Sequence, residues 1–326
     1  MAERLCLGKR VWVFIKNHQQ WLGFIVLIVA LLYSYITVLF EPKELLLDII
    51  FGALFLLLIF GMIHAFKIEK EEVKKTVHFD NLDGLFVILG VMATYTVVHF
   101  FGISVVLASC SIGLLGHFII KKFEVAIYCG SFAGMVSVVM FNFYEVLALA
   151  FICAFIYILT KPIFSGYGGK LGTVAFMSSL IVHSLFGDEF LVVASNIHLG
   201  FLLATTIIGV TVTFYIQHKL KVTAVFASAV TSFVFTLVLV LFFSEHLVYA
   251  VVFFSASFIG MSSKEKLPNI VFVVISGAIL GAVYYIFIHF FNGLGGKLGL
   301  MALISVVITS GISKIFARIE TQISKS

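Results

Sequence analysis

Residues 166–176, GYGGKLGTVAF, recur at residues 293–303 as GLGGKLGLMAL, and this pair of stretches decides the fold. Two earlier blocks recur in the same order, GVMATYTVVHFFGISVVLAS at 90–109 with GVTVTFYIQHKLKVTAVFAS at 209–228, and SFAGMVS at 131–137 with SFIGMSS at 257–263. The offsets are 119, 126 and 127 residues, so only small insertions separate the three blocks. Chance similarity between apolar helices explains one such block, whereas three in order indicate an internal repeat.

The composition places this repeat in a membrane. Of the 326 residues, 62% are hydrophobic and 11% are charged, with a mean hydropathy of +1.18. Soluble domains have about 45–50% apolar and about 25% charged residues. A helix needs about 20 apolar residues to cross the hydrocarbon layer, and in lipid it must satisfy its own backbone polar groups. We therefore predict an all-α membrane protein with twelve transmembrane helices, at residues 21–40, 45–66, 84–101, 103–120, 125–141, 145–160, 171–186, 198–217, 222–243, 246–262, 269–290 and 298–316.

The distribution of charge predicts the orientation of these helices, because inner loops of membrane proteins are rich in lysine and arginine. With the N-terminus inside, the inner loops hold Lys67, Lys70, Lys74, Lys75, Lys121, Lys122, Lys161, Lys170, Lys219, Lys221, Lys264, Lys266, Lys314, Arg318 and Lys325. Only Lys43 and Lys297 fall outside, where the acidic residues are Glu41, Glu44, Asp188, Glu189 and Glu245. We expect a bacterial inner-membrane protein with both termini in the cytoplasm. This topology explains the net charge of +5 without a nucleic-acid partner.

Each repeat contains five predicted helices, in residues 84–186 and 198–316. Because five is odd, the second repeat must enter the membrane from the opposite side, which places Lys170 inside and its repeat mate Lys297 outside. We predict two N-terminal helices in residues 1–80, a first repeat in 81–190 and an inverted second repeat in 191–326. Inverted repeats are typical of transporters and of some channels.

The motif GxGGKLG ends one predicted helix and opens the next. Glycine permits positive φ angles and close backbone approach, and the first turn of a helix carries partial positive charge, which a lysine would reinforce. The simpler interpretation is a tight turn whose lysine reaches the headgroups. The alternative is an anion or substrate site at a helix N-terminus, and its candidate residues are Gly168, Gly169, Lys170, Gly295, Gly296 and Lys297.

The motif SFxGM lies inside the third predicted helix of each repeat. Small residues allow helices to cross closely in lipid. They also mark broken helices whose backbone lines a central site, and in that case the paired serines and methionines would face one another near the symmetry axis. The candidate residues for such a pathway are Ser131, Gly134, Met135, Ser257, Gly260 and Met261.

The sequence lacks the HExxH, GxSxG and CxxC patterns of common membrane-enzyme and metal sites. We expect no catalytic residue, no metal site and no cofactor. The predicted helix centres carry no carboxylate, which favours facilitated or channel-like passage over coupling through buried acids. The best interpretation is a transporter or channel that moves a small anionic or neutral polar solute between the repeats, with the lipid bilayer as its surroundings. The alternative is a membrane scaffold or assembly subunit, and the first two helices are candidates for homo-oligomer contacts.

The predicted topology can be tested by cysteine labelling. A membrane-impermeant thiol reagent added outside is expected to label a cysteine placed beside Lys297 and to miss one placed beside Lys121. The reverse pattern would rule out the inverted repeat.

Overall fold

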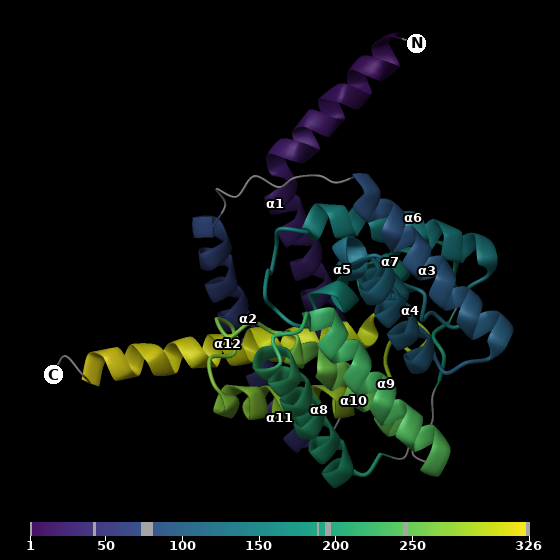
Figure 1. The fold of residues 1–326 in the computed structure, drawn as a ribbon. Coiled ribbons are helices and arrows are strands. Elements are labelled where there is room, and N and C mark those ends of the chain that lie inside the picture. Colours follow the sequence, from purple (N-terminus) through teal and green to yellow (C-terminus); the bar gives the residue numbers. More distant parts are fainter. Residues whose placement is uncertain are drawn as a thin grey trace.

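The computed structural model of this protein describes residues 2–41, 44–72, 81–187, 189–192, 197–243 and 247–323. Every regular element in these residues is helical (Figure 1). The elements are α1 (Ala2–Leu39), α2 (Leu45–Glu72), α3 (Asn81–Phe101), α4 (Val105–Ile119), the short 3-10 helix η1 (Lys121–Phe123), α5 (Glu124–Ala133), α6 (Phe143–Thr160), α7 (Lys170–Phe186), α8 (Leu199–Lys219), α9 (Ala224–Phe242), α10 (Val248–Gly260), α11 (Ile270–Phe287) and α12 (Lys297–Ile323). The charged positions Lys43, Lys74, Lys75, Asp188, Glu245 and Lys325, used above for the topology, lie outside the described residues.

Eight of the described helices are long and apolar enough to cross a membrane, namely α1, α2, α3, α6, α8, α9, α11 and α12. The chain is therefore a multi-pass membrane protein. Helices α4, α7 and α10 are apolar but shorter, and α5 has only 10 residues. The structure thus contains a helix near each of the twelve predicted positions, but not twelve of full membrane-spanning length.

Two of the short helices, α5 and α10, end where the SFxGM motif occurs. Residues 134–142 and 261–269 follow them without forming α-helix, so the predicted helix at 125–141 is shorter than expected. The N–H of Ser137 donates to the carbonyl of Gly293, and that of Ser263 donates to the carbonyl of Gly166, both at 2.9 Å. Within a membrane, backbone groups released from a helix need such partners.

Asparagine residues cap the N-termini of the helices that follow these turns. The Oδ1 of Asn142 accepts the N–H groups of Tyr144 and Glu145 at 2.9 and 3.1 Å, and the Glu145 carboxylate accepts the N–H of Asn142. Asn269, which is 127 residues after Asn142, accepts two N–H groups in the first turn of α11. A side-chain acceptor at this position satisfies donors that have no intrahelical partner, so α6 and α11 begin in corresponding ways.

Helices α7 and α12 cross at their first turns with no side chain between them. Each follows a glycine with positive φ, 87° at Gly169 and 80° at Gly296. A Cβ atom on Gly172 would lie 2.6 Å from the Cα of Gly299, and one on Gly299 would lie 2.5 Å from the Cα of Gly172. Only glycine at both positions allows this approach.

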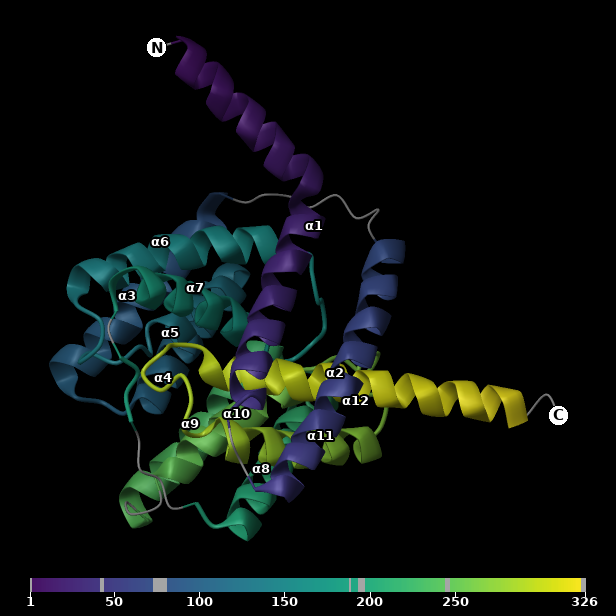
Figure 2. The ribbon, with the colours of Figure 1, turned by 180° about the vertical axis from the view of Figure 1, so that it is seen from behind.

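The two groups of five helices pack in matching patterns. Helix α3 lies against α5 and α6 as α8 lies against α10 and α11, and between the groups α4 packs on α9 and α7 on α12. In Figure 1, α3 to α7 occupy the upper right of the ribbon and α8 to α11 the lower part. Helices α1 and α2 lie outside both groups, α1 against α6 and α2 against α12, and both cross in front of α12 in Figure 2.

The close crossing of α7 and α12 predicts that one methyl group added at the crossing point destabilises the folded protein. Replacing Gly172 by alanine should lower the free energy of unfolding by about 1–3 kcal/mol, the usual cost of overpacking. The matched control is Gly52→Ala in α2, where no heavy atom lies within 4 Å of the added Cβ and alanine should stabilise the helix by about 0.5–1 kcal/mol. Thermal unfolding in detergent measures both, and equal stability of the two variants would contradict the packing.

Candidate functional site

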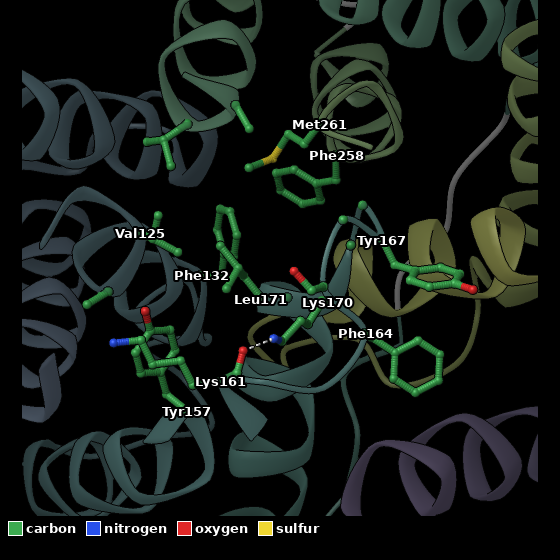
Figure 3. Close-up of a pocket in the computed structure, with 18 of the residues that line it drawn as sticks. Val125, Phe132, Tyr157, Lys161, Phe164, Tyr167, Lys170, Leu171, Phe258 and Met261 are labelled. Carbon is green, nitrogen blue, oxygen red and sulfur yellow. Dashed lines mark hydrogen bonds between the residues drawn. The ribbon is translucent and has the colours of Figure 1, made fainter. Parts of the chain in front are cut away.

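One cavity between the helices, which we call cavity 1, has a volume of about 450 Å³. Its walls come from both groups of helices: the glycine loop 165–172 and the start of α5 in the first, and Phe258 and Met261 in the second. Figure 3 shows Phe258 and Met261 across the cavity from Tyr157 and Lys161. The cavity therefore lies at the interface of the two groups.

The second cavity, cavity 2, has a volume of about 470 Å³ and a corresponding lining. The glycine loop 292–298 replaces loop 165–172, and the turn 135–138 brings Met135 to the place that Met261 has in cavity 1. Residues 127 positions apart line the two cavities in pairs, namely Tyr157 and Tyr284, Gly169 and Gly296, and Lys170 and Lys297. The sequence repeat thus generates two matching cavities.

A pair of phenylalanine rings separates the cavities. Phe132 and Phe258 line both cavities, and their ring centroids are 4.6 Å apart. The ring of Tyr128 lies 4.4 Å from that of Phe132, and the ring of Phe254 lies 4.6 Å from that of Phe258. Both phenylalanines are only 2% exposed, so they form an apolar wall between two cavities whose linings are largely apolar and carry a few polar and charged groups.

The glycine loops fix this wall from the two sides. A Cβ atom on Gly168 would lie 2.1 Å from the carbonyl oxygen of Phe258, and one on Gly295 would lie 2.7 Å from that of Phe132. The loop of each group therefore rests on the end of the helix that carries the phenylalanine of the other group. Any larger residue would push the wall away from the loop.

The two lysines bind corresponding carbonyl groups. The Nζ of Lys170 donates to the carbonyl of Lys161 at 2.8 Å, and that of Lys297 donates to the carbonyl of Ile288 at 3.2 Å. Lys297 also donates to the Oδ1 of Asn292 at 2.7 Å. Each lysine thus joins the two ends of the turn between two helices and at the same time lines a cavity. The simpler interpretation expected a tight turn whose lysine reaches the headgroups, whereas here both ammonium groups bind carbonyl oxygens of the protein.

The cavities differ in their charged residues. Cavity 1 is lined by Asp83, Lys122, Glu124, Lys161 and Lys170, and the Lys161 ammonium pairs with the buried Asp83 carboxylate. Among the described residues that line cavity 2, Lys297 alone is charged. The buried Nδ2 of Asn292, beside it, has no hydrogen-bond acceptor among the described residues. Cavity 2 is therefore largely apolar, with Lys297 as its one charged group and Ser137, Tyr284 and Asn292 as its polar side chains.

The structure places seven of the twelve predicted pathway residues on the cavities. Gly168, Gly169, Lys170 and Met261 line cavity 1, and Met135, Gly296 and Lys297 line cavity 2. Gly295 packs on the end of α5. Gly134 packs on α3 and Gly260 on α8, with added Cβ atoms 2.4 Å from the Val91 carbonyl oxygen and 2.5 Å from Thr213.

The two predicted serines of SFxGM do not face one another. Ser131 is hydrogen-bonded to Ser109 at 2.8 Å, and Ser257 to Ser228 at 2.8 Å, so each joins helices of its own group. Both serines are fully buried and line neither cavity.

Several residues of the site were missed by sequence reasoning. Phe132 and Phe258 occupy the second position of SFxGM, yet phenylalanine is so common in this chain that the motif did not single them out. Asn292, Asp83 and Glu124 lie near helix ends, where a polar residue ordinarily indicates a loop. The sequence offered a clue to Asn292, which lies five residues before the repeated Lys297.

The sequence gives no match to any protein-family model and no significant match to curated proteins or solved structures. The function of the chain must therefore be inferred from the two cavities themselves.

The closed phenylalanine wall predicts one-sided chemical access. In a chain whose native cysteines are replaced by alanine, we expect Met261→Cys to react with an impermeant thiol reagent from one side of the membrane and Met135→Cys from the other. Adding Phe132→Ala and Phe258→Ala should join the cavities and make each cysteine reactive from both sides. Phe151→Ala, which shortens a ring that is 60% exposed on α6, is the control. Reaction of either cysteine from both sides with the rings intact would contradict a closed wall.

Proposed function

We propose that this chain is a multi-pass transporter or channel of a bacterial inner membrane, which moves a small anionic or neutral polar solute between two inverted five-helix repeats. One observation carries the proposal: two matching cavities, each lined by a glycine loop and a lysine, share the contacting rings of Phe132 and Phe258 as part of their walls. A solute path through cavity 1, past the rings and into cavity 2 would use residues of both repeats throughout.

The inverted arrangement is supported by the odd number of helices in each repeat and by the lysine distribution. Cavity 1 is surrounded by Lys122, Lys161 and Lys170, all assigned to inner loops, whereas Lys297 of cavity 2 belongs to an outer loop. We therefore assign cavity 1 to the cytoplasmic side and cavity 2 to the outer side, with both termini in the cytoplasm. Matching cavities that face opposite sides are what an inverted repeat produces.

The preference for an anionic or polar solute rests on the lining. Both repeated lysines lie in the first turn of a helix, where the partial positive charge of the helix has the same sign. Apolar constrictions regulate passage in channels, so the phenylalanine pair is suited to close a path that has a lysine on each side. The same wall suits either a gated channel or a transporter that exposes its two cavities in turn.

The main alternative is a scaffold or assembly subunit whose repeats serve packing alone. Close glycine crossings such as that of Gly172 and Gly299 are expected of both functions. Packing alone gives no reason for matching cavities of about 450 and 470 Å³, each lined by a lysine, at the same interface. The cavities therefore favour transport.

Flux in liposomes tests the proposal. The reconstituted protein is supplied with chloride, nitrate, sulfate and glycerol as probes. Removing either charge by Lys170→Gln or Lys297→Gln should lower anion flux by about tenfold, which corresponds to ~1.4 kcal/mol. The double variant should lower it further.

Lys264→Gln is the matched control, because Lys264 is an exposed lysine between α10 and α11, and it should leave flux unchanged. Thermal unfolding confirms that each variant is folded. Unchanged anion flux in the double variant would mean that the two lysines only stabilise their turns. Absence of flux for every probe in the wild type would favour the scaffold.

A further inference from the structure

A partly buried histidine pairs with a buried glutamate that lines cavity 1. The Nδ1 of His117, in the last turn of α4, lies 2.5 Å from the Oε2 of Glu124, the first residue of α5. Their side chains are 14% and 9% exposed. Thr223, which caps α9 in the other repeat, donates its hydroxyl to the same Oε2 at 3.1 Å. The pair therefore joins three helices across the repeat interface, and Glu124 lines the cavity.

This geometry is suited to binding a proton. With one proton between them, the Nδ1–H of His117 donates to the Glu124 carboxylate and the pair carries a charge of −1. A second proton can bind at the free Nε2, which makes the histidine cationic and the pair neutral. No other bond forms or breaks, and histidine is the side chain that usually changes charge near neutral pH.

The pair has no counterpart in the other repeat. By the repeat offsets, His117 corresponds to Thr236, Glu124 to Ala250 and Thr223 to Ser104, so the corresponding wall of cavity 2 holds no titratable group at these positions. The lysine loops, in contrast, occur in both repeats. A proton bound at this pair would therefore act on cavity 1 alone.

The charges around the pair determine the sign of the effect. The ionisable residues on the cavity wall or on the segments packed around the pair include Asp83, Lys121, Lys122, Tyr157, Lys161, Tyr167, Lys170, His218, Lys219 and Lys221. Asp83 is paired with Lys161, so the Glu124 carboxylate is the acid that offsets the remaining lysines on the cavity wall. Neutralising the pair would leave the wall more positive and the cavity more attractive to an anion.

We propose that His117 and Glu124, positioned by Thr223, form a proton-binding site that couples proton uptake to anion binding in cavity 1. This proposal rests on the proposed transport function, and it revises the sequence-based expectation of passage without a buried acid. A proton and an anion would occupy the cytoplasmic cavity together, so that a proton gradient influences the movement of the solute.

Anion binding at two pH values tests the coupling without any transport measurement. Binding of chloride, nitrate and sulfate to the full chain in detergent is measured by the rise in unfolding temperature that a bound ligand causes. At about pH 5 the wild type should bind anion at least about fivefold more tightly than at about pH 8, a typical coupling between linked sites. His117→Gln removes the group that takes up the second proton and should remove the difference. Glu124→Gln retains the shape and an acceptor for Thr223, and should make the difference smaller, because the protonated imidazole loses its carboxylate partner.

Glu320→Gln is the control, because it removes an exposed carboxylate at the far end of α12 and should preserve the pH dependence. Equal affinity of the wild type at the two pH values would overturn the coupling, as would a His117→Gln variant that keeps the full difference. Neither outcome would affect the proposed function, which the lysine variants test separately through flux. A protein that binds none of the three anions would refute both the coupling and the anionic solute.

Discussion

The contact of backbone with backbone at Gly172 and Gly299 is the constraint on which the rest of this structure depends. Lipid offers no hydrophobic force to hold helices together, so close packing must do so. Because α7 and α12 cross at their first turns, the loops that precede them are brought to the centre of the molecule. There each loop rests on the carbonyl end of α5 or α10, and this contact places Phe132 and Phe258 against each other.

The scaffold is nearly symmetric, but its chemistry is not. Corresponding glycines, lysines and aromatic residues line the two cavities, whereas Asp83, Glu124 and most of the lysines are found on one side only. A further difference lies at the centre, where the hydroxyl of Tyr128 is 3.0 Å from that of Ser228 while its counterpart Phe254 has no hydroxyl. The two groups of helices thus share their packing pattern, and a few side chains distinguish the two cavities.

Much of the fold could be predicted from the sequence, because hydropathy and the repeat are long-range signals that require no contact information. All twelve helices lie near their predicted positions, and the glycine loops occur where expected. The early end of α5 could not be predicted, since residues 134–141 are apolar and only the bond from Ser137 to Gly293 shows why they leave the helix. The candidate site was predicted in part: the lysines were found from their repetition, while the serines of SFxGM proved to join helices. The phenylalanine wall required three-dimensional information, because ring contact across 126 residues leaves no local pattern.

The sizes of the cavities and of the wall between them have a consequence for hydration. A space of about 450 Å³ can hold several water molecules, each of which takes about 30 Å³ in the liquid. A small ion could therefore keep most of its water shell in either cavity and would have to shed it at the two rings, which offer no replacement donors. Under the proposed transport function, the energy of dehydration, and not the width of the cavities, would set the order of competing solutes, and large, weakly hydrated anions would pass more easily than small, strongly hydrated ones.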